Sequence, residues 1–159
     1  MAKVLISYFS KSGNTKAMAQ YIKDGLEALG DVEVDLKKVQ DTKMNDLRSS
    51  DGIIIGSPTY FGVMATEVKE LMDKSIQCYG KLAGKVGGAF TSSGMIGCGN
   101  ETTILSILQG FLIHGMIVKG VQKGNHYGPV SVGAPDDDGR AECIQYGQMI
   151  GMLVKRLGG

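Results

Sequence analysis

Apolar and polar positions alternate along this chain with two different periods. Short apolar runs rich in Val and Ile are each followed by a cluster of turn-forming residues, which is typical of buried strands. Between these runs, apolar residues recur every three or four positions, which is typical of helices that cover a sheet. The pattern predicts strands at residues 3–9, 32–39, 52–56, 85–90 and 116–121, helices at residues 17–29, 66–74, 100–113 and 144–157, and a loop at residues 122–140.

The order of these elements predicts the fold class. Strands and helices alternate, and this order is typical of α/β domains in which helices cover both faces of a parallel sheet. The chain shows no internal repeat and no linker, so residues 1–159 are expected to form one domain. Such sheets bind ligands at the carboxyl ends of their strands. Functional residues are therefore expected in the loops after the first, third and fourth strands.

Composition and charge narrow the classes of function. The chain has 17 Lys and Arg against 16 Asp and Glu, and a net charge of +1 gives no broad attraction to nucleic acid or to an anionic membrane. Three widely spaced Cys without a CxxC pair indicate the reduced thiols of a cytoplasmic protein and no metal site. No apolar stretch approaches the ~20 residues of a membrane helix, so no membrane insertion is expected. Gly is unusually frequent, with 24 residues, so many glycines are expected to serve special backbone geometry.

The loop after the first strand has the composition of an anion site. It ends where the first helix begins, and its sequence is Ser10-Lys11-Ser12-Gly13-Asn14-Thr15. Amide groups and the dipole at a helix N-terminus favour an anion, and Gly13 allows the backbone to approach it closely. The loop has neither a Walker A nor a G-x-G-x-x-G pattern, which favours a phosphate monoester. An ordinary polar helix cap is the alternative interpretation.

Aromatic residues and glycines mark the other two loops. The loop after the third strand is Ser57-Pro58-Thr59-Tyr60-Phe61-Gly62, whose adjacent rings offer a stacking surface unless Phe61 packs into the core. Three glycines leave amide groups accessible in the next loop, Thr91-Ser92-Ser93-Gly94-Met95-Ile96-Gly97-Cys98-Gly99-Asn100, unless it is simply a flexible surface loop. A phosphate cradle, a stacking surface and a row of amides together fit a planar heterocycle with one phosphate. The predicted ligand is flavin mononucleotide (FMN).

The same segments resemble the flavodoxin superfamily over nearly the whole chain. The loop at residues 10–15 is similar to the phosphate loop of that superfamily, [S/T]-x-[S/T]-G-x-T, which binds FMN without a metal. The chain is most similar to the WrbA-type FMN-dependent NAD(P)H:quinone oxidoreductases, in the segments at residues 58–64, 80–85, 91–94, 114–116, 127–139 and 146–147. The resemblance implies a three-layer α/β/α sandwich with a five-stranded parallel sheet of order 2-1-3-4-5.

The resemblance also implies which residues serve the cofactor. The flavin itself would carry the chemistry, so no catalytic side chain is assigned. For His114 the alternatives are a place behind the flavin and a plain helix end. For Cys98 they are a flavin contact and an inert thiol. His126 either covers the flavin or a neighbour's site, or it belongs to a solvated loop. The expected cofactor-binding residues are Ser10, Lys11, Ser12, Gly13, Asn14, Thr15, Pro58, Thr59, Tyr60, Phe61, Gly62, Thr91, Ser92, Ser93, Gly94, Gly97, Cys98, Gly99 and His126.

Two departures from the WrbA pattern leave the activity open between two classes. Tyr60 stands where that family has Arg, and the segments that support its tetramer are short here, so the chain has the length of a short-chain flavodoxin. One hypothesis is an enzyme that takes electrons from NAD(P)H and passes them to a quinone. The other is a one-electron carrier for a redox protein, although carriers usually have an acidic face and this chain has only Asp136-Asp137-Asp138. A module without cofactor is a third interpretation, and the assembly stays open between a homodimer and a homotetramer.

Overall fold

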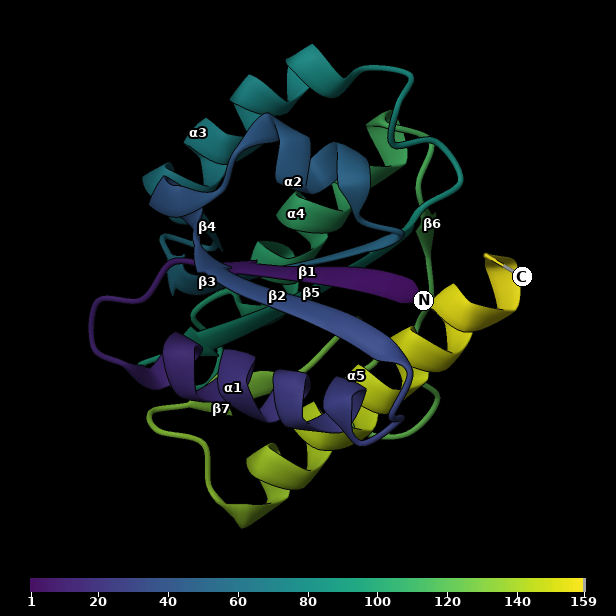
Figure 1. The fold of residues 1–159 in the computed structure, drawn as a ribbon. Coiled ribbons are helices and arrows are strands. Elements are labelled where there is room, and N and C mark those ends of the chain that lie inside the picture. Colours follow the sequence, from purple (N-terminus) through teal and green to yellow (C-terminus); the bar gives the residue numbers. More distant parts are fainter. Residues whose placement is uncertain (159) are drawn as a thin grey trace.

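A parallel sheet forms the centre of the molecule (Figure 1). The computed structural model describes residues 1–158. The strand order β2-β1-β3-β5-β6 corresponds to the order 2-1-3-4-5 implied by the resemblance, so the predicted fold class is confirmed. The strands are β1 (Ala2–Tyr8), β2 (Val32–Lys38), β3 (Gly52–Tyr60), β5 (Val86–Ser93) and β6 (Ile117–Val118), with β4 (Val63–Met64) paired to β3 and β7 (Val130–Val132) paired to β5.

Helices cover both faces because successive strand residues point to opposite sides of the sheet. Ile54 packs in the core beneath α1 and α5, whereas Ile53 and Ile55 pack in the core beneath α2, α3 and α4. Within residues 1–158, no helix is long and apolar enough to cross a membrane. The helices are α1 (Asn14–Glu27), α2 (Met44–Ser49), α3 (Thr66–Lys74), α4 (Asn100–Ile113) and α5 (Asp137–Leu157), with short 3-10 turns η1 (Val39–Asp41) and η2 (Ser75–Cys78).

Glycines allow α1 and α5 to pack closely side by side (Figure 1). A Cβ atom on Gly147 would collide with the carbonyl oxygen of Ile22, and one on Gly25 would collide with that of Ile144. Two backbones can come this close only where a side chain is missing. Part of the high glycine content therefore serves helix packing, far from the loops in which the sequence pattern placed it.

The fifth strand differs from the prediction. Instead of one strand over residues 116–121, the sheet pairing stops at Val118 and resumes at Val130, where β7 pairs with the end of β5. Residues 119–129, which we call the excursion, leave the sheet in between because Lys119 and Gly120 interrupt the apolar run. In the gap, the Tyr146 hydroxyl of α5 accepts a hydrogen bond from the Ala89 N–H at 3.1 Å. The predicted loop over residues 122–140 is therefore partly strand and partly helix.

The last helix begins at Asp137, earlier than the predicted start at residue 144. Asp136 caps it, since the side chain of Asp136 accepts a hydrogen bond from the Gly139 N–H at 2.8 Å. Asp137 and Asp138 lie in the first turn, where the helix dipole favours negative charge. The acidic run in the sequence therefore starts a helix.

Candidate functional site

Hydroxyl groups connect the start of α1, which follows β1, with the carboxyl ends of β3 and β5. Thr15 Oγ1 at the start of α1 lies 2.8 Å from Ser92 Oγ of β5. Thr59 Oγ1 of β3 lies 2.9 Å from Thr91 Oγ1 of β5 and 3.3 Å from Asn100 Oδ1 at the start of α4. The structure thus brings the three loops singled out in the sequence together at one edge of the sheet.

The first loop leaves the N-terminus of α1 open. Gly13 is the N-cap residue in the left-handed conformation (φ 98°), and no side chain caps the helix. The first turn contains no acidic residue, and Gly13 has open space on its Cα, since a Cβ there would meet nothing within 4 Å. Ser10 Oγ accepts a hydrogen bond from the Gly13 N–H at 3.1 Å, which shapes the loop. The alternative interpretation of this loop, an ordinary side-chain cap, is wrong because none of its polar side chains caps the helix.

The side chains of this loop divide into two groups. Lys11 and Ser12 are exposed, as is Gly13, and they surround the open helix end. Thr15 is 1% exposed, and its hydroxyl is paired with Ser92. The buried Thr15 therefore connects α1 to β5, whereas the sequence pattern grouped it with the exposed donors.

The second loop is a tight hairpin between β3 and β4. Tyr60 pairs with Val63, and Phe61 and Gly62 form the turn with φ angles of 49° and 81°. Positive φ at both central residues is the geometry of a type I′ turn. Within residues 1–158, Phe61 is the only residue other than Gly with positive φ, and its side chain is fully exposed, at 106%. The alternative in which Phe61 packs into the core is wrong, and both aromatic rings lie at the surface beside the strand ends.

The third loop is shorter than the sequence pattern suggested. Thr91, Ser92 and Ser93 belong to β5 and are buried, because β7 and β3 flank them. Thr91 Oγ1 donates to the Ser57 carbonyl at 2.7 Å, and Ser93 Oγ donates to the Met95 carbonyl at 3.1 Å. These three hydroxyl groups therefore hold the base of the loop, and residues 94–99 form its exposed part.

Residues 94–99 form a glycine-rich segment with accessible amides. Gly97 and Gly99 have φ angles of 79° and 102°, which glycine adopts without strain. Within residues 1–158, the N–H groups of residues 94–98 donate to no protein acceptor. The Cys98 thiol donates to the Met95 carbonyl at 3.0 Å, inside the loop itself. The segment thus presents unpaired donors next to the exposed rings of the hairpin.

The two histidines lie on different elements, His126 in the excursion and His114 at the end of α4. His126 belongs to the excursion, where its Nδ1 lies 2.8 Å from the Val121 carbonyl oxygen, and it lines a small cavity of about 110 Å³ beside Glu101 of α4. His114 ends α4, at the end of the helix away from the strand ends, and its Nε2 lies 2.7 Å from Ser75 Oγ. His114 is therefore a helix-end residue, which is one of the two alternatives left open above.

Two residues of α4 that the sequence did not single out contact the hairpin. Thr102 Oγ1 donates to the Gly62 carbonyl oxygen at 2.6 Å, and Ser106 Oγ accepts from the Met64 N–H at 3.2 Å. The two hydroxyl residues are four positions apart, so they share one face of the helix. That spacing was the only signal in the sequence, and it does not indicate which segment the face contacts.

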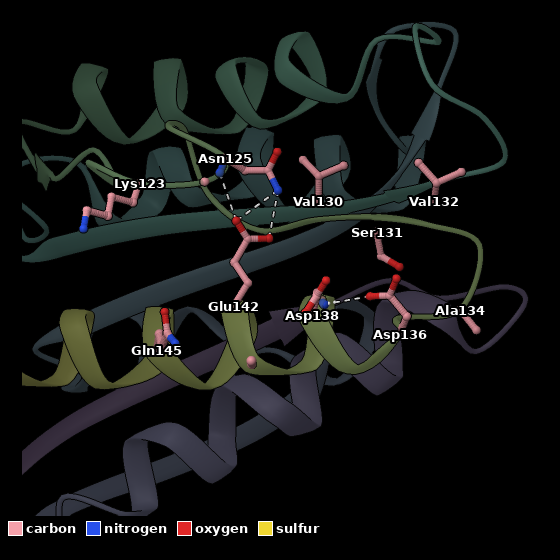
Figure 2. A pocket seen from close by; sticks show the side chains of 13 residues that line it. Lys123, Asn125, Val130, Ser131, Val132, Ala134, Asp136, Asp138, Glu142 and Gln145 are labelled. Atoms are coloured by element: carbon pink, nitrogen blue, oxygen red, sulfur yellow. Dashed lines mark hydrogen bonds between the residues drawn. The ribbon is translucent and has the colours of Figure 1, made fainter.

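A separate hollow of about 610 Å³ lies between the excursion, β7 and the start of α5 (Figure 2). Figure 2 shows the Glu142 carboxylate of α5 pointing to Asn125, which donates to it through its backbone N–H at 2.9 Å and through Nδ2 at 2.8 Å. The same view shows Asp136 capping α5. These carboxylates hold the excursion and the helix in place. Within residues 1–158, no group of three or more His, Cys, Asp and Glu side chains is arranged to hold a metal ion.

Solved structures with the same fold include flavodoxins. An archaeal flavodoxin superposes with a TM-score of 0.81 at 30% identity, covering 96% of this chain and 99% of that one. A flavodoxin described as a WrbA-like protein, from Agrobacterium tumefaciens, superposes with a TM-score of 0.83 at 22% identity, covering 98% of this chain and 99% of that one, and this likeness concerns the fold alone.

Sequence relatives lead to the same family. A flavodoxin of Aquifex aeolicus is 36% identical over 162 residues, with 97% of this chain and 88% of the relative covered. An NAD(P)H dehydrogenase (quinone) of Archaeoglobus fulgidus is 32% identical over 191 residues, with 99% and 100% covered. The family model described as a flavodoxin domain matches residues 5–96, which include the first two loops and the end of β5. With this match, with relatives that align over nearly its whole length and with the fold in common, the chain belongs to the flavodoxin family.

Proposed function

We propose that this protein binds FMN at the three loops and acts as an NAD(P)H:quinone-type oxidoreductase. The observation that carries the proposal is the open N-terminus of α1, next to exposed rings and free amides at the same edge of the sheet. FMN is the cofactor of the flavodoxin family. When bound, FMN supplies the acceptance of electrons from a nicotinamide and their transfer to a quinone.

The phosphate would lie at the start of α1. The unpaired amides of the first helical turn and the hydroxyl groups of Ser10 and Ser12 can donate to it, and Lys11 supplies positive charge. Asn14 is the first residue of the helix, and its side-chain amide is a further donor. The residues present fit a dianion, because the helix end has no competing side-chain cap and no carboxylate in its first turn.

The ring system would lie between the hairpin and the glycine-rich segment. The rings of Tyr60 and Phe61 offer flat apolar surfaces, and the free N–H groups of residues 94–98 offer donors to the carbonyl oxygens of a heterocycle. Thr59 and Pro58 fix the base of the hairpin against β5. The residues of the chain would bind and orient the ring, and no side chain is assigned a catalytic role.

The surface around the site favours a small apolar acceptor. Phe61, Met95 and Ile96 are exposed on the two loops, at 106%, 65% and 87%. The acidic run is limited to the three residues at the cap and first turn of α5, and the net charge of the chain is +1. A quinone needs apolar surface, whereas a docking carrier usually relies on an acidic face. We therefore place the enzyme ahead of the carrier.

The carrier is the second candidate. It is supported by the Aquifex aeolicus flavodoxin, of which the aligned region covers 88%, so the two chains are similar in length. A module that has lost its cofactor is disfavoured by the open helix end and the free amides, which a protein without ligand has no reason to keep.

The test begins with adding FMN to the apoprotein and following the quenching of flavin fluorescence. NADH or NADPH is then added under argon. Bleaching of the flavin absorbance and turnover with benzoquinone would support the enzyme. Slow reaction with both nucleotides, together with reduction by dithionite in two separate one-electron stages, would support the carrier instead. Absence of quenching would rule out both redox functions.

A further inference from the structure

Two hydroxyl groups join the β3–β4 hairpin to α4. Thr102 Oγ1 donates to the Gly62 carbonyl oxygen in the turn at 2.6 Å. One helical turn later, Ser106 Oγ accepts from the Met64 N–H at 3.2 Å and donates to the Thr103 carbonyl at 2.7 Å. The hairpin therefore has one attachment at its tip and one at its returning strand.

The turn also rests directly on the residue that ends the glycine-rich segment. A Cβ atom on Gly99 would collide with the Cα of Gly62. Thr102 Oγ1 lies 3.1 Å from the Gly99 carbonyl oxygen, in addition to its shorter bond to Gly62. Thr102 therefore contacts both segments that surround the proposed ring site, and a shift of one segment displaces the other.

The side chain at the tip of the hairpin has no packing that holds it. Phe61 has a φ angle of 49° and a fully exposed side chain, so its ring is not fixed by core contacts. Left-handed backbone at a residue other than Gly is unfavourable and persists only where the surroundings impose it. Besides the strand pair Tyr60–Val63 and the close approach of Gly99, the bond from Thr102 holds the turn.

We propose that Thr102 is a positioning residue that holds the hairpin and the glycine-rich segment in the ring-binding arrangement before the ligand arrives. This inference rests on the proposed binding of FMN. Its physical reason is preorganisation: a site already in the bound arrangement loses less conformational entropy on binding. Thr102 itself would not touch the cofactor and would act through the Gly62 carbonyl and the turn.

The first measurement uses the apoprotein and needs no ligand. Thr102→Val keeps the shape of the side chain and removes the donor, whereas Thr102→Ser keeps the hydroxyl. We expect faster amide hydrogen exchange at residues 59–64 in Thr102→Val and exchange at the wild-type rate in Thr102→Ser. Unchanged exchange in Thr102→Val would overturn the positioning role, whatever the protein binds.

The second measurement compares FMN with riboflavin, which has the ring but lacks the phosphate. We expect Thr102→Val to weaken the binding of both ligands by the same factor, about three- to tenfold, which corresponds to one net hydrogen bond. Ser12→Ala is the matched control at the phosphate loop and should weaken FMN binding while leaving riboflavin binding unchanged. Equal binding of riboflavin by wild type and Thr102→Val would refute the positioning role of Thr102 but not the proposed binding of FMN. A wild-type protein that binds neither ligand would refute the proposed function.

Discussion

Gly13 combines the features on which the proposed phosphate site depends. Its φ of 98° suits Gly, it caps α1 without a side chain, and the space at its Cα is open to a ligand. Single residues of this kind decide whether a helix end is available to an anion. At the residue scale, therefore, the sharpest test places a charged side chain on the Cα of Gly13.

We expect Gly13→Asp to abolish FMN binding, because a carboxylate at the helix end repels the phosphate and occupies its place. Fluorescence quenching by the apoprotein measures the affinity. Gly30→Asp is the matched control, since Gly30 also has positive φ and open space but lies at the other end of α1. Retained micromolar binding in Gly13→Asp would contradict the phosphate cradle.

The imidazole of His114 is expected to make the stability of the folded protein depend on pH. Burial lowers the pKa of its imidazole below the ordinary value of 6.5, and its Nδ1 is buried without a hydrogen-bond partner among residues 1–158. The unfolded chain therefore takes up a proton at a higher pH than the folded protein does, and stability is lost as pH falls below about 6.5.

Urea unfolding between pH 7 and about pH 5 measures this effect. We expect His114→Gln to flatten the decline of the unfolding free energy over this range. His126→Gln should leave it unchanged, because His126 is exposed in the excursion. An equally steep decline in His114→Gln would assign the dependence to other groups.

At the scale of elements, the split fifth strand is the main irregularity of the fold. The strand paired with β5 changes from β6 to β7, and in the gap between them the Tyr146 hydroxyl accepts a hydrogen bond from the Ala89 N–H. Burial raises the pKa of this hydroxyl to about 12, so it stays protonated at neutral pH. A helix side chain thus replaces the carbonyl group that a continuous strand would have supplied.

Tyr146→Phe should destabilise the protein by about 1–3 kcal/mol, because the buried Ala89 N–H loses its acceptor while the ring is retained. The free energy of unfolding in urea is the measurement. Tyr79→Phe is the control and should change stability little, since Tyr79 is 67% exposed. Equal stability of Tyr146→Phe and wild type would mean that water or a neighbouring group takes over this bond.

At the scale of the whole molecule, charge separates the two candidate functions. The net charge is +1, and Asp136, Asp137 and Asp138 lie at the cap and first turn of α5. Ion pairs occupy other carboxylates, among them Glu70 with Lys74 at 2.6 Å. Positive and negative charges are nearly equal in number over the chain, and this balance disfavours a strongly one-signed face that could steer a partner.

We expect reduction of a basic protein acceptor such as cytochrome c to change by less than about twofold as salt rises through the physiological range. The rate of flavin reoxidation in stopped flow measures this dependence, with neutral benzoquinone as the control acceptor. A steep loss of rate with cytochrome c alone would favour the carrier.

Much of the site could be anticipated from the sequence, because a parallel sheet places the ends of β1, β3 and β5 at one edge. The sequence was least informative about hydroxyl side chains that could either face a ligand or bond to other groups inside the protein. Thr15, Thr91 and Ser92 have the composition of ligand donors, yet they are buried and bond to protein groups. Composition alone does not distinguish a hydroxyl that binds a ligand from one that joins two elements of the fold.

The sequence by itself determined the α/β class, the place of the three loops and the likeness to flavodoxins, because hydrophobic periodicity and local turn residues act over short distances along the chain. The tertiary structure alone decided which donors stay free, how the fifth strand divides, and that Thr102 holds a turn 40 residues earlier in the chain. These features depend on contacts between distant segments, which form only when the sheet and its helices pack together.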